Sequence, residues 1–163
     1  MLKLAKQKAD GILFFMRPFH DVKARCRQLP SASFRVCANV VTCVSADREA
    51  AETRVRKTVA FYISNGRAYS RLIERLALQE ENQDAIAAVR HDWLKGRRED
   101  AARRVPRELL GEVAIFGTPT DCRRAIERYS RVAGLHMLGL QFNAGESNIG
   151  ESLNLYSTLF DNK

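Results

Sequence analysis

Three short apolar runs bounded by turn residues stand out along the 163-residue chain. They are Ile12 to Met16, Phe34 to Ser45 and Leu135 to Phe142, and the middle run is apolar on both parities and rich in β-branched residues. Runs of this kind are typical of strands in a parallel sheet that helices cover on both faces. We therefore predict three buried strands.

Between these runs, apolar residues recur at helical spacing. Short helices are predicted on either side of the first run, and a long helix begins at Asp47. Further helical patterns follow at Tyr69–Leu76, Ile86–Leu94 and Leu109–Val113, and no strand pattern interrupts them. Because an ordinary connection between strands is much shorter, we interpret residues 64–114 as a helical insertion.

The segment Gly117-Thr118-Pro119-Thr120-Asp121 is a strong helix start. The Thr118 hydroxyl can cap free backbone N–H groups, Pro119 suits the first helical position, and Asp121 interacts favourably with the helix dipole. We predict a helix from about 119 to 133, ended by Gly134 in the left-handed conformation. Alternation of strands and helices along the chain favours an α/β fold with a parallel sheet.

The formal net charge of +8 raises the question of nucleic-acid binding. Most arginines alternate with acidic residues on helical faces, as solvated helices do. A denser group, Arg97 to Arg107, is interrupted by Glu99 and Asp100 and has no interleaved aromatic residues for base stacking. Nucleic-acid binding is therefore kept only as a minor alternative.

Neither a membrane span nor an export signal is indicated. The apolar runs are shorter than the roughly 18 to 20 residues that a membrane helix needs. The segment that follows Met1 is charged and amphipathic, unlike the apolar core of a signal peptide. The sequence thus predicts a cytoplasmic protein.

The cysteines and histidines do not form a zinc-binding pattern. Cys26, Cys37, Cys43 and Cys122 lack C-x-x-C spacing, and the three histidines are far apart. We expect buried free thiols, with Cys37 and Cys43 on one face of the long strand.

No histidine is favoured as a catalytic base. His20 and His91 each have an adjacent aspartate, but consecutive residues on a helix point apart. His136 lies at the start of its strand, whereas parallel sheets hold their sites at the carboxyl ends of the strands.

Four segments in register resemble the luciferase-like monooxygenase superfamily, including its methylenetetrahydromethanopterin reductase-like branch. The stretch from Leu4 to Leu13 is similar to the family pattern L-A-x-x-x-A-D-G followed by apolar residues. The long strand with Ala46-Asp47-Arg48 after it and the helical excursion follow in the family's order. Gly117 to Cys122, with Tyr129 behind it, resembles the segment that precedes the last barrel strand.

The resemblance implies that residues 1–163 are the carboxyl-terminal part of a (β/α)8 TIM barrel. Strands six, seven and eight would be Ile12–Phe15, Phe34–Val44 and Leu135–Phe142, with the helical insertion after the seventh. Three strands cannot close a barrel, so two edges and the inner face should be open. We therefore expect a homo-oligomer or pairing with an amino-terminal complementing chain.

The resemblance also implies an oxidoreductase that uses FMN or a deazaflavin of the coenzyme F420 type with a small-molecule substrate, by hydride transfer or monooxygenation. No catalytic residue can be assigned, and whether the chain is active or a truncated, inactive fragment stays open. A non-enzymatic helical interaction module is the main alternative.

Barrel enzymes carry their sites at the carboxyl ends of the strands. Gln141 and Asn143, which share a parity with Gly139, are the candidate cofactor-binding residues, and Arg17 could meet an anionic ligand group. In the alternative interpretation, the two amides only satisfy the backbone of the loop 144–150, and Arg17 is solvated.

Overall fold

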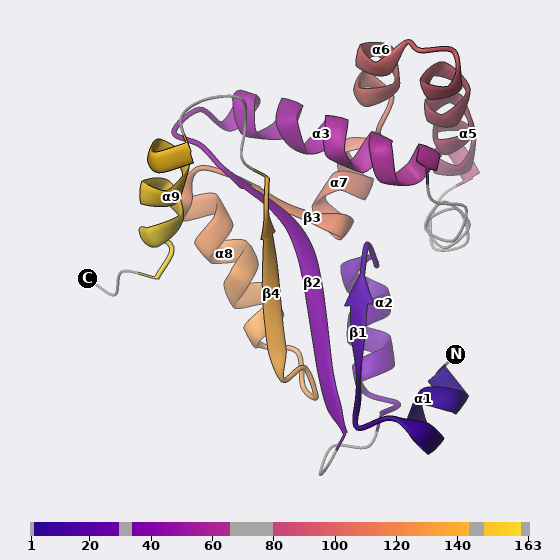
Figure 1. The fold of residues 1–163 in the computed structure, drawn as a ribbon, viewed down its shortest axis with the longest axis vertical. Helices are drawn as coiled ribbons and strands as arrows, with labels where there is room; N and C mark the ends of the chain where they lie inside the picture. Colours follow the sequence, from indigo (N-terminus) through magenta and orange to yellow (C-terminus); the bar gives the residue numbers. More distant parts are fainter. Residues whose placement is uncertain (1, 30–33, 66–79, 144–148, 161–163) are drawn as a thin grey trace.

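A parallel sheet runs through the middle of the molecule (Figure 1). Its longest strand, β2 (Arg35–Val44), pairs with β1 (Gly11–Phe15) along one edge and with β4 (Met137–Phe142) along the other. The computed structural model describes residues 2–29, 34–65, 80–143 and 149–160. The three strands expected from the apolar runs are present, each shifted by no more than two residues at either end.

A fourth strand, β3 (Ala114–Gly117), was not predicted. It pairs in parallel with Val41–Val44 of β2. The odd-numbered Arg35 and Ser45 direct their backbone N–H groups to the edge that holds β1 and β3, whereas the carbonyl of Thr42 accepts a hydrogen bond on the β4 edge. Because β4 pairs with Cys37–Thr42, opposite both β1 and β3, the strands β1, β2 and β4 form a run of three adjacent strands.

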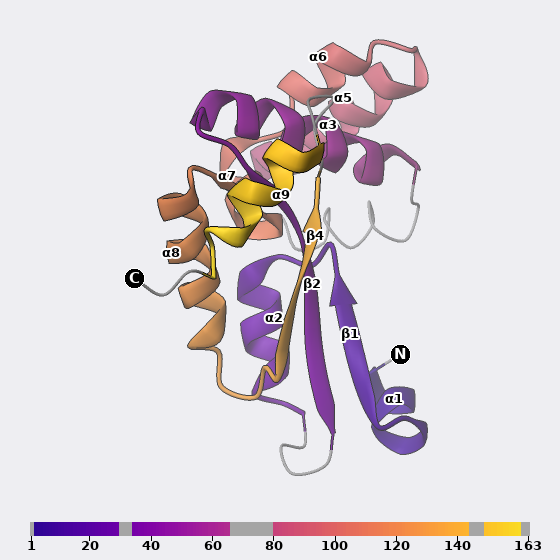
Figure 2. The same ribbon diagram turned by 60° about the vertical axis from the view of Figure 1, so that its left-hand side comes forward.

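Helices cover both faces of the sheet. Helices α2 and α8 lie behind it in Figure 1 and share one hydrophobic cluster with α9 and the even-numbered residues of β2. Helix α3 crosses the opposite face at the carboxyl end of β2 (Figure 2). In chain order the helices are α1 (Leu2–Lys8), α2 (Phe19–Cys26), α3 (Arg48–Asn65), α5 (Glu80–Leu94), α6 (Arg98–Arg103), α7 (Arg107–Val113), α8 (Pro119–Ser130) and α9 (Ile149–Ser157).

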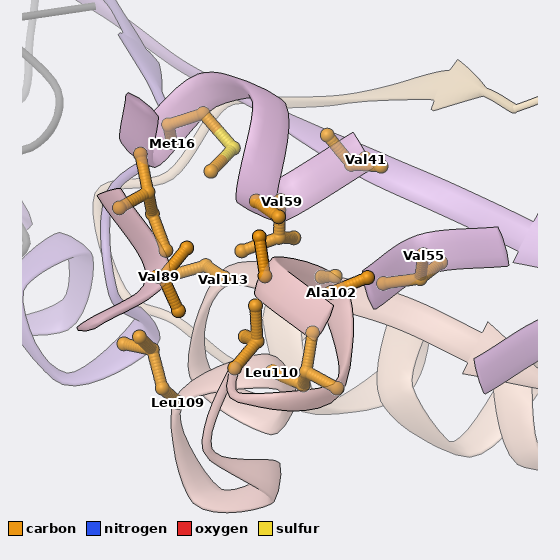
Figure 3. Packing of buried hydrophobic residues seen from close by; sticks show 14 of the residues in the cluster. Met16, Val41, Val55, Val59, Val89, Ala102, Leu109, Leu110 and Val113 are labelled. Carbon is orange, nitrogen blue, oxygen red and sulfur yellow. The ribbon is translucent and has the colours of Figure 1, made fainter. Parts of the chain in front are cut away.

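The helices α5, α6 and α7 pack onto α3. Buried side chains of α3, such as Val55 and Val59, meet Val89 of α5, Ala102 of α6 and Leu110 of α7 (Figure 3). This cluster confirms a helical layer after β2. The helix expected at Tyr69–Leu76 lies outside the described residues.

Part of the α3-side face is not covered by the described helices. Leu13, Cys37 and Met137 are paired in register across β1, β2 and β4. Leu13 is 62% exposed and Met137 63% exposed, and Cys37 is only half-buried. These three residues are therefore accessible to solvent on this face of the sheet. In the described ranges, no helix is both long and apolar enough to cross a membrane.

Candidate functional site

The carboxyl end of β4 is joined to α3 by two side-chain amides. Gln141 Nε2 donates a hydrogen bond to the Tyr62 hydroxyl at 3.0 Å. Asn143 Nδ2 donates to Thr58 Oγ1 at 2.6 Å and to the Arg54 carbonyl at 3.3 Å. The three acceptors are spaced by four residues and therefore lie along one face of α3. The structure thus brings Gln141 and Asn143 to the same helix.

The polar groups of Asn143 form several hydrogen bonds within the protein. Its side-chain nitrogen already donates to two acceptors on α3. Its backbone N–H donates to the Thr42 carbonyl at 2.8 Å, and its carbonyl accepts from the Tyr156 hydroxyl at 3.2 Å. Contact between Asn143 and a ligand remains a prediction, and its main observed role is to fix α3 and α9 to the end of the sheet.

The Gln141 side chain forms fewer hydrogen bonds than the Asn143 side chain. Among the described residues, no hydrogen bond reaches its side-chain carbonyl oxygen. Tyr62, which orients this amide, packs edge-on against the Phe15 ring with 5.1 Å between ring centres. The arrangement leaves one amide acceptor at the carboxyl end of β4, next to Tyr62, which contacts Phe15 at the carboxyl end of β1.

Arg17 lies on the other side of the sheet from Gln141. Its guanidinium pairs with Asp21, which also accepts from Arg25 at 2.7 Å. It lies 5.3 Å from the ring centre of Phe14, which belongs to the cluster on the α2 side. The structure does not bring Arg17 to the two amides, and its guanidinium is paired with Asp21, which Arg25 shares.

The three buried thiols offer no reactive nucleophile near these amides. Cys26, Cys43 and Cys122 are buried, which confirms the expected buried free thiols for three of the four cysteines. Burial raises the pKa of Cys43, and it raises the pKa of Cys122 to about 12. Both groups are therefore protonated at neutral pH, and the thiolate is the nucleophilic form.

Two of the histidines make structural contacts. His20 Nδ1 lies 2.8 Å from Glu112 Oε2, and the backbone N–H of His20 donates to the same oxygen at 3.0 Å. His136 Nδ1 accepts a hydrogen bond from the backbone N–H of Val36 at 3.2 Å. As predicted, His20 is not paired with its neighbour Asp21, and His136 supports the start of β4.

We expect Glu112 to make stability depend on pH. Burial raises the pKa of its carboxyl group, but hydrogen bonds from His20 and Arg128 outweigh burial and lower that pKa from 4.5. A lowered carboxyl pKa stabilises the fold above the unfolded value, and this contribution is lost as pH falls through the folded value. The loss therefore lies below about pH 4.5.

The test is the free energy of unfolding in urea at pH 6 and at pH 3.5, for the wild type and for Glu112→Gln. The drop between the two pH values should be smaller in the variant, because glutamine does not titrate. An equal drop in both proteins would show that Glu112 does not carry this dependence.

The arginines between Arg97 and Arg107 pair with acidic or aromatic side chains of the protein. Asp92, only 3% exposed, accepts from both Arg97 and Arg104, and these hydrogen bonds lower its pKa. The other partners are Asp100 for Arg103, Glu52 for Arg107 and the Trp93 ring for Arg98. These pairings support a structural role for the cluster, because Arg104 joins the end of α6 to α5 and Arg107 joins α7 to α3.

Known proteins resemble this chain in sequence and in fold. A sequence profile of the luciferase-like monooxygenase family matches residues 1–136. The coenzyme F420-dependent tetrahydromethanopterin reductase from Methanopyrus kandleri superposes with a TM-score of 0.74 at 18% identity, over 95% of this chain and 45% of that chain. No protein in a curated set of sequences matches.

A second solved structure shares the fold. It is an F420-dependent secondary alcohol dehydrogenase in complex with an F420-acetone adduct, with a TM-score of 0.56 at 14% identity, over 98% of this chain and 46% of that chain. The present chain thus spans less than half the length of both enzymes. It has an α/β fold whose parallel sheet matches part of a TIM-barrel enzyme.

Proposed function

Since the chain belongs to the luciferase-like monooxygenase family, we propose that it forms the carboxyl-terminal wall of a flavin- or deazaflavin-dependent oxidoreductase barrel. The observation that carries the proposal is the position of Gln141 at the carboxyl end of a parallel strand. Its side-chain carbonyl oxygen accepts no hydrogen bond from the described residues. Barrel enzymes place their sites at that end. The names of the two similar structures, both F420-dependent, favour a deazaflavin.

The strand order supports the assignment of β1, β2 and β4 to strands six, seven and eight. Neighbouring barrel strands follow one another along the chain, and β1-β2-β4 is such a run once β3 is set aside as a short addition to the β2 edge. Residues 64–114 are then the insertion after the seventh strand, within one domain of residues 1–163.

The residues at this end fit the ring of a flavin or deazaflavin better than its phosphate-bearing tail. Gln141 can accept a hydrogen bond from a ring N–H group, and the Phe15 and Tyr62 rings supply apolar contact. Arg17, the candidate for an anionic group, is already paired with Asp21. A bound cofactor of this kind supplies the hydride chemistry, while the protein orients the ring and limits its access to water.

The proposal is tested by NMR titration of the purified, isotope-labelled chain with FMN and with coenzyme F420, because NMR detects weak binding. We expect shifts confined to the end of β4 and to Tyr62, and Gln141→Leu should weaken binding about three- to tenfold, as loss of one hydrogen bond does. Gln83→Leu, an exposed change on α5, is the matched control and should bind like the wild type.

The absence of localised shifts at millimolar ligand would overturn the proposal. So would binding by the Gln141→Leu variant that equals binding by the wild type. The control removes the objection that any added leucine perturbs the spectrum.

The exposure of Leu13 and Met137 bears on the second candidate function, a non-enzymatic helical interaction module. A free sheet face and free strand edges promote association with further strands, from a second copy or from a complementing amino-terminal chain. Light scattering across a range of protein concentrations distinguishes the states. Association would agree with an open barrel wall, and a monomer that is stable at every concentration would favour a self-sufficient module.

A further inference from the structure

Asn39 is a polar residue in the middle of the otherwise apolar strand β2. It pairs in register with Phe15 on one side and with Gly139 on the other. Side chains of paired residues on neighbouring strands point to the same face, so Asn39 lies on the face that carries Val41 and Gln141. The side chain is half-buried, and no hydrogen bond reaches it from the described residues.

Gly139 leaves the space that the Asn39 side chain uses. A Cβ atom at Gly139 would lie 3.2 Å from Asn39 Oδ1, which is tighter than most such contacts. The lack of a side chain on β4 therefore lets the Asn39 amide lie close to that strand. Asn39 and Gln141 then stand on neighbouring strands, one residue pair apart along this face.

The polarity of this face changes along the strands. Residues paired in register form rows across the three strands. The row nearer the amino ends of the strands, formed by Leu13, Cys37 and Met137, has no side-chain amide. The next two rows hold one amide each, Asn39 and then Gln141. The amides are thus placed toward the carboxyl ends of the strands, where the candidate site lies, and not toward the opposite end.

An amide at this position needs a partner when the face is covered. A buried polar group without a hydrogen bond loses its contact with water and gains nothing in return. Asn39 offers a donor and an acceptor at one point, and Gln141 offers a second acceptor. A flat ring with neighbouring N–H and C=O groups along its edge would pair with the donor and the acceptor of Asn39, and its N–H can be shared with Gln141.

We propose that Asn39 is a second ligand-facing amide, which binds with Gln141 the N–H and C=O edge of a planar heteroaromatic ring. This inference rests on the proposed function, because the ring would be that of the flavin or deazaflavin. Gly139 acts with Asn39 by leaving room for its side chain. The aromatic ring of Phe15, next to Asn39 in register, borders the same position.

The probe for this test is riboflavin, which has the ring but no phosphate. In the wild type, the side-chain NH2 resonances of Asn39 should shift on titration. Asn39→Leu and Asn39→Asp should each weaken binding about three- to tenfold, because each loses the amide donor. Cys37→Ala, on the same strand and face one row below, should bind like the wild type.

Thermal unfolding of each variant shows whether the fold is retained, and Asn39→Asp, with nearly the same size as asparagine, serves if Asn39→Leu unfolds. Wild-type affinity in a folded Asn39 variant, with Gln141 still required, would overturn this inference alone. No binding of riboflavin, FMN or coenzyme F420 by the wild type would overturn the proposed function together with it.

Discussion

Replacing Gly117 with alanine is expected to lower the free energy of unfolding by about 2 to 4 kcal/mol, from backbone strain and the loss of a helix cap. Gly117 has a φ of 125°, in a region that side chains with a Cβ rarely adopt. An added Cβ would lie 2.8 Å from Asp121 Oδ2. The substitution therefore combines strain with a clash at the start of α8.

Neither partner in this clash can move freely. The Gly117 carbonyl accepts a hydrogen bond from the backbone N–H of Ser45 at 3.0 Å, which closes the β2–β3 pairing. Asp121 accepts from the backbone N–H of Thr118 at 3.1 Å, and its own N–H donates to the Thr118 hydroxyl at 3.3 Å. Relief of the clash would break one of these two arrangements.

Gly111→Ala is the matched control for Gly117→Ala. Gly111 lies inside α7, and a Cβ there would meet nothing within 4 Å. Alanine favours the helix over glycine, so this change should stabilise the protein by about 0.5 to 1 kcal/mol. Urea unfolding followed by circular dichroism measures both variants. Equal effects of the same sign would contradict the explanation from backbone conformation.

The start of α8 was predictable because its determinants are local. Thr118, Pro119 and Asp121 act within one helical turn, and the capping box between Thr118 and Asp121 is present. Gly134 also has the expected positive φ, at 84°. The helix ends at Ser130, three residues before the expected limit, since residues 131–134 form turns. Such interactions can be identified without knowledge of the tertiary fold.

The strand β3 could not be identified in this way. Leu109, Leu110 and Val113 recur at helical spacing, and the chain passes from α7 directly into Ala114–Gly117 without a turn residue between them. Four residues are too few to show the alternation of a strand. Their conformation depends on pairing with Val41–Val44, about 70 residues earlier in the chain, which no local pattern reveals.

The candidate site was predictable in position but not in its contacts. Strand parity and the end of the last apolar run single out Gln141 and Asn143. Their partners on α3 lie about 80 residues earlier, so only the path of that helix across the sheet reveals Tyr62. The pairing of Arg17 with Asp21 could be predicted from the local sequence. Asp21 follows it by four residues at a helix start, the spacing of a helical ion pair.

Leu110→Ala should lower the free energy of unfolding by about 2 to 5 kcal/mol, because it leaves a cavity in a packed core. Leu110 is completely buried beneath α3, among the side chains of α5, α6 and α7 (Figure 3). Leu94→Ala is the matched control, since Leu94 is 79% exposed. Its effect should stay within about 0.5 kcal/mol of zero.

The same experiment tests whether the helical layer and the sheet unfold together. The single tryptophan, Trp93, packs against the cluster that contains Leu110, so its fluorescence reports on the helical layer. Circular dichroism reports on the whole chain. Val41 and Cys43 of β2 belong to the same cluster, so we expect both probes to shift to the same lower urea midpoint in Leu110→Ala, as one cooperative transition requires. Separate midpoints would show that the helical layer unfolds independently of the sheet.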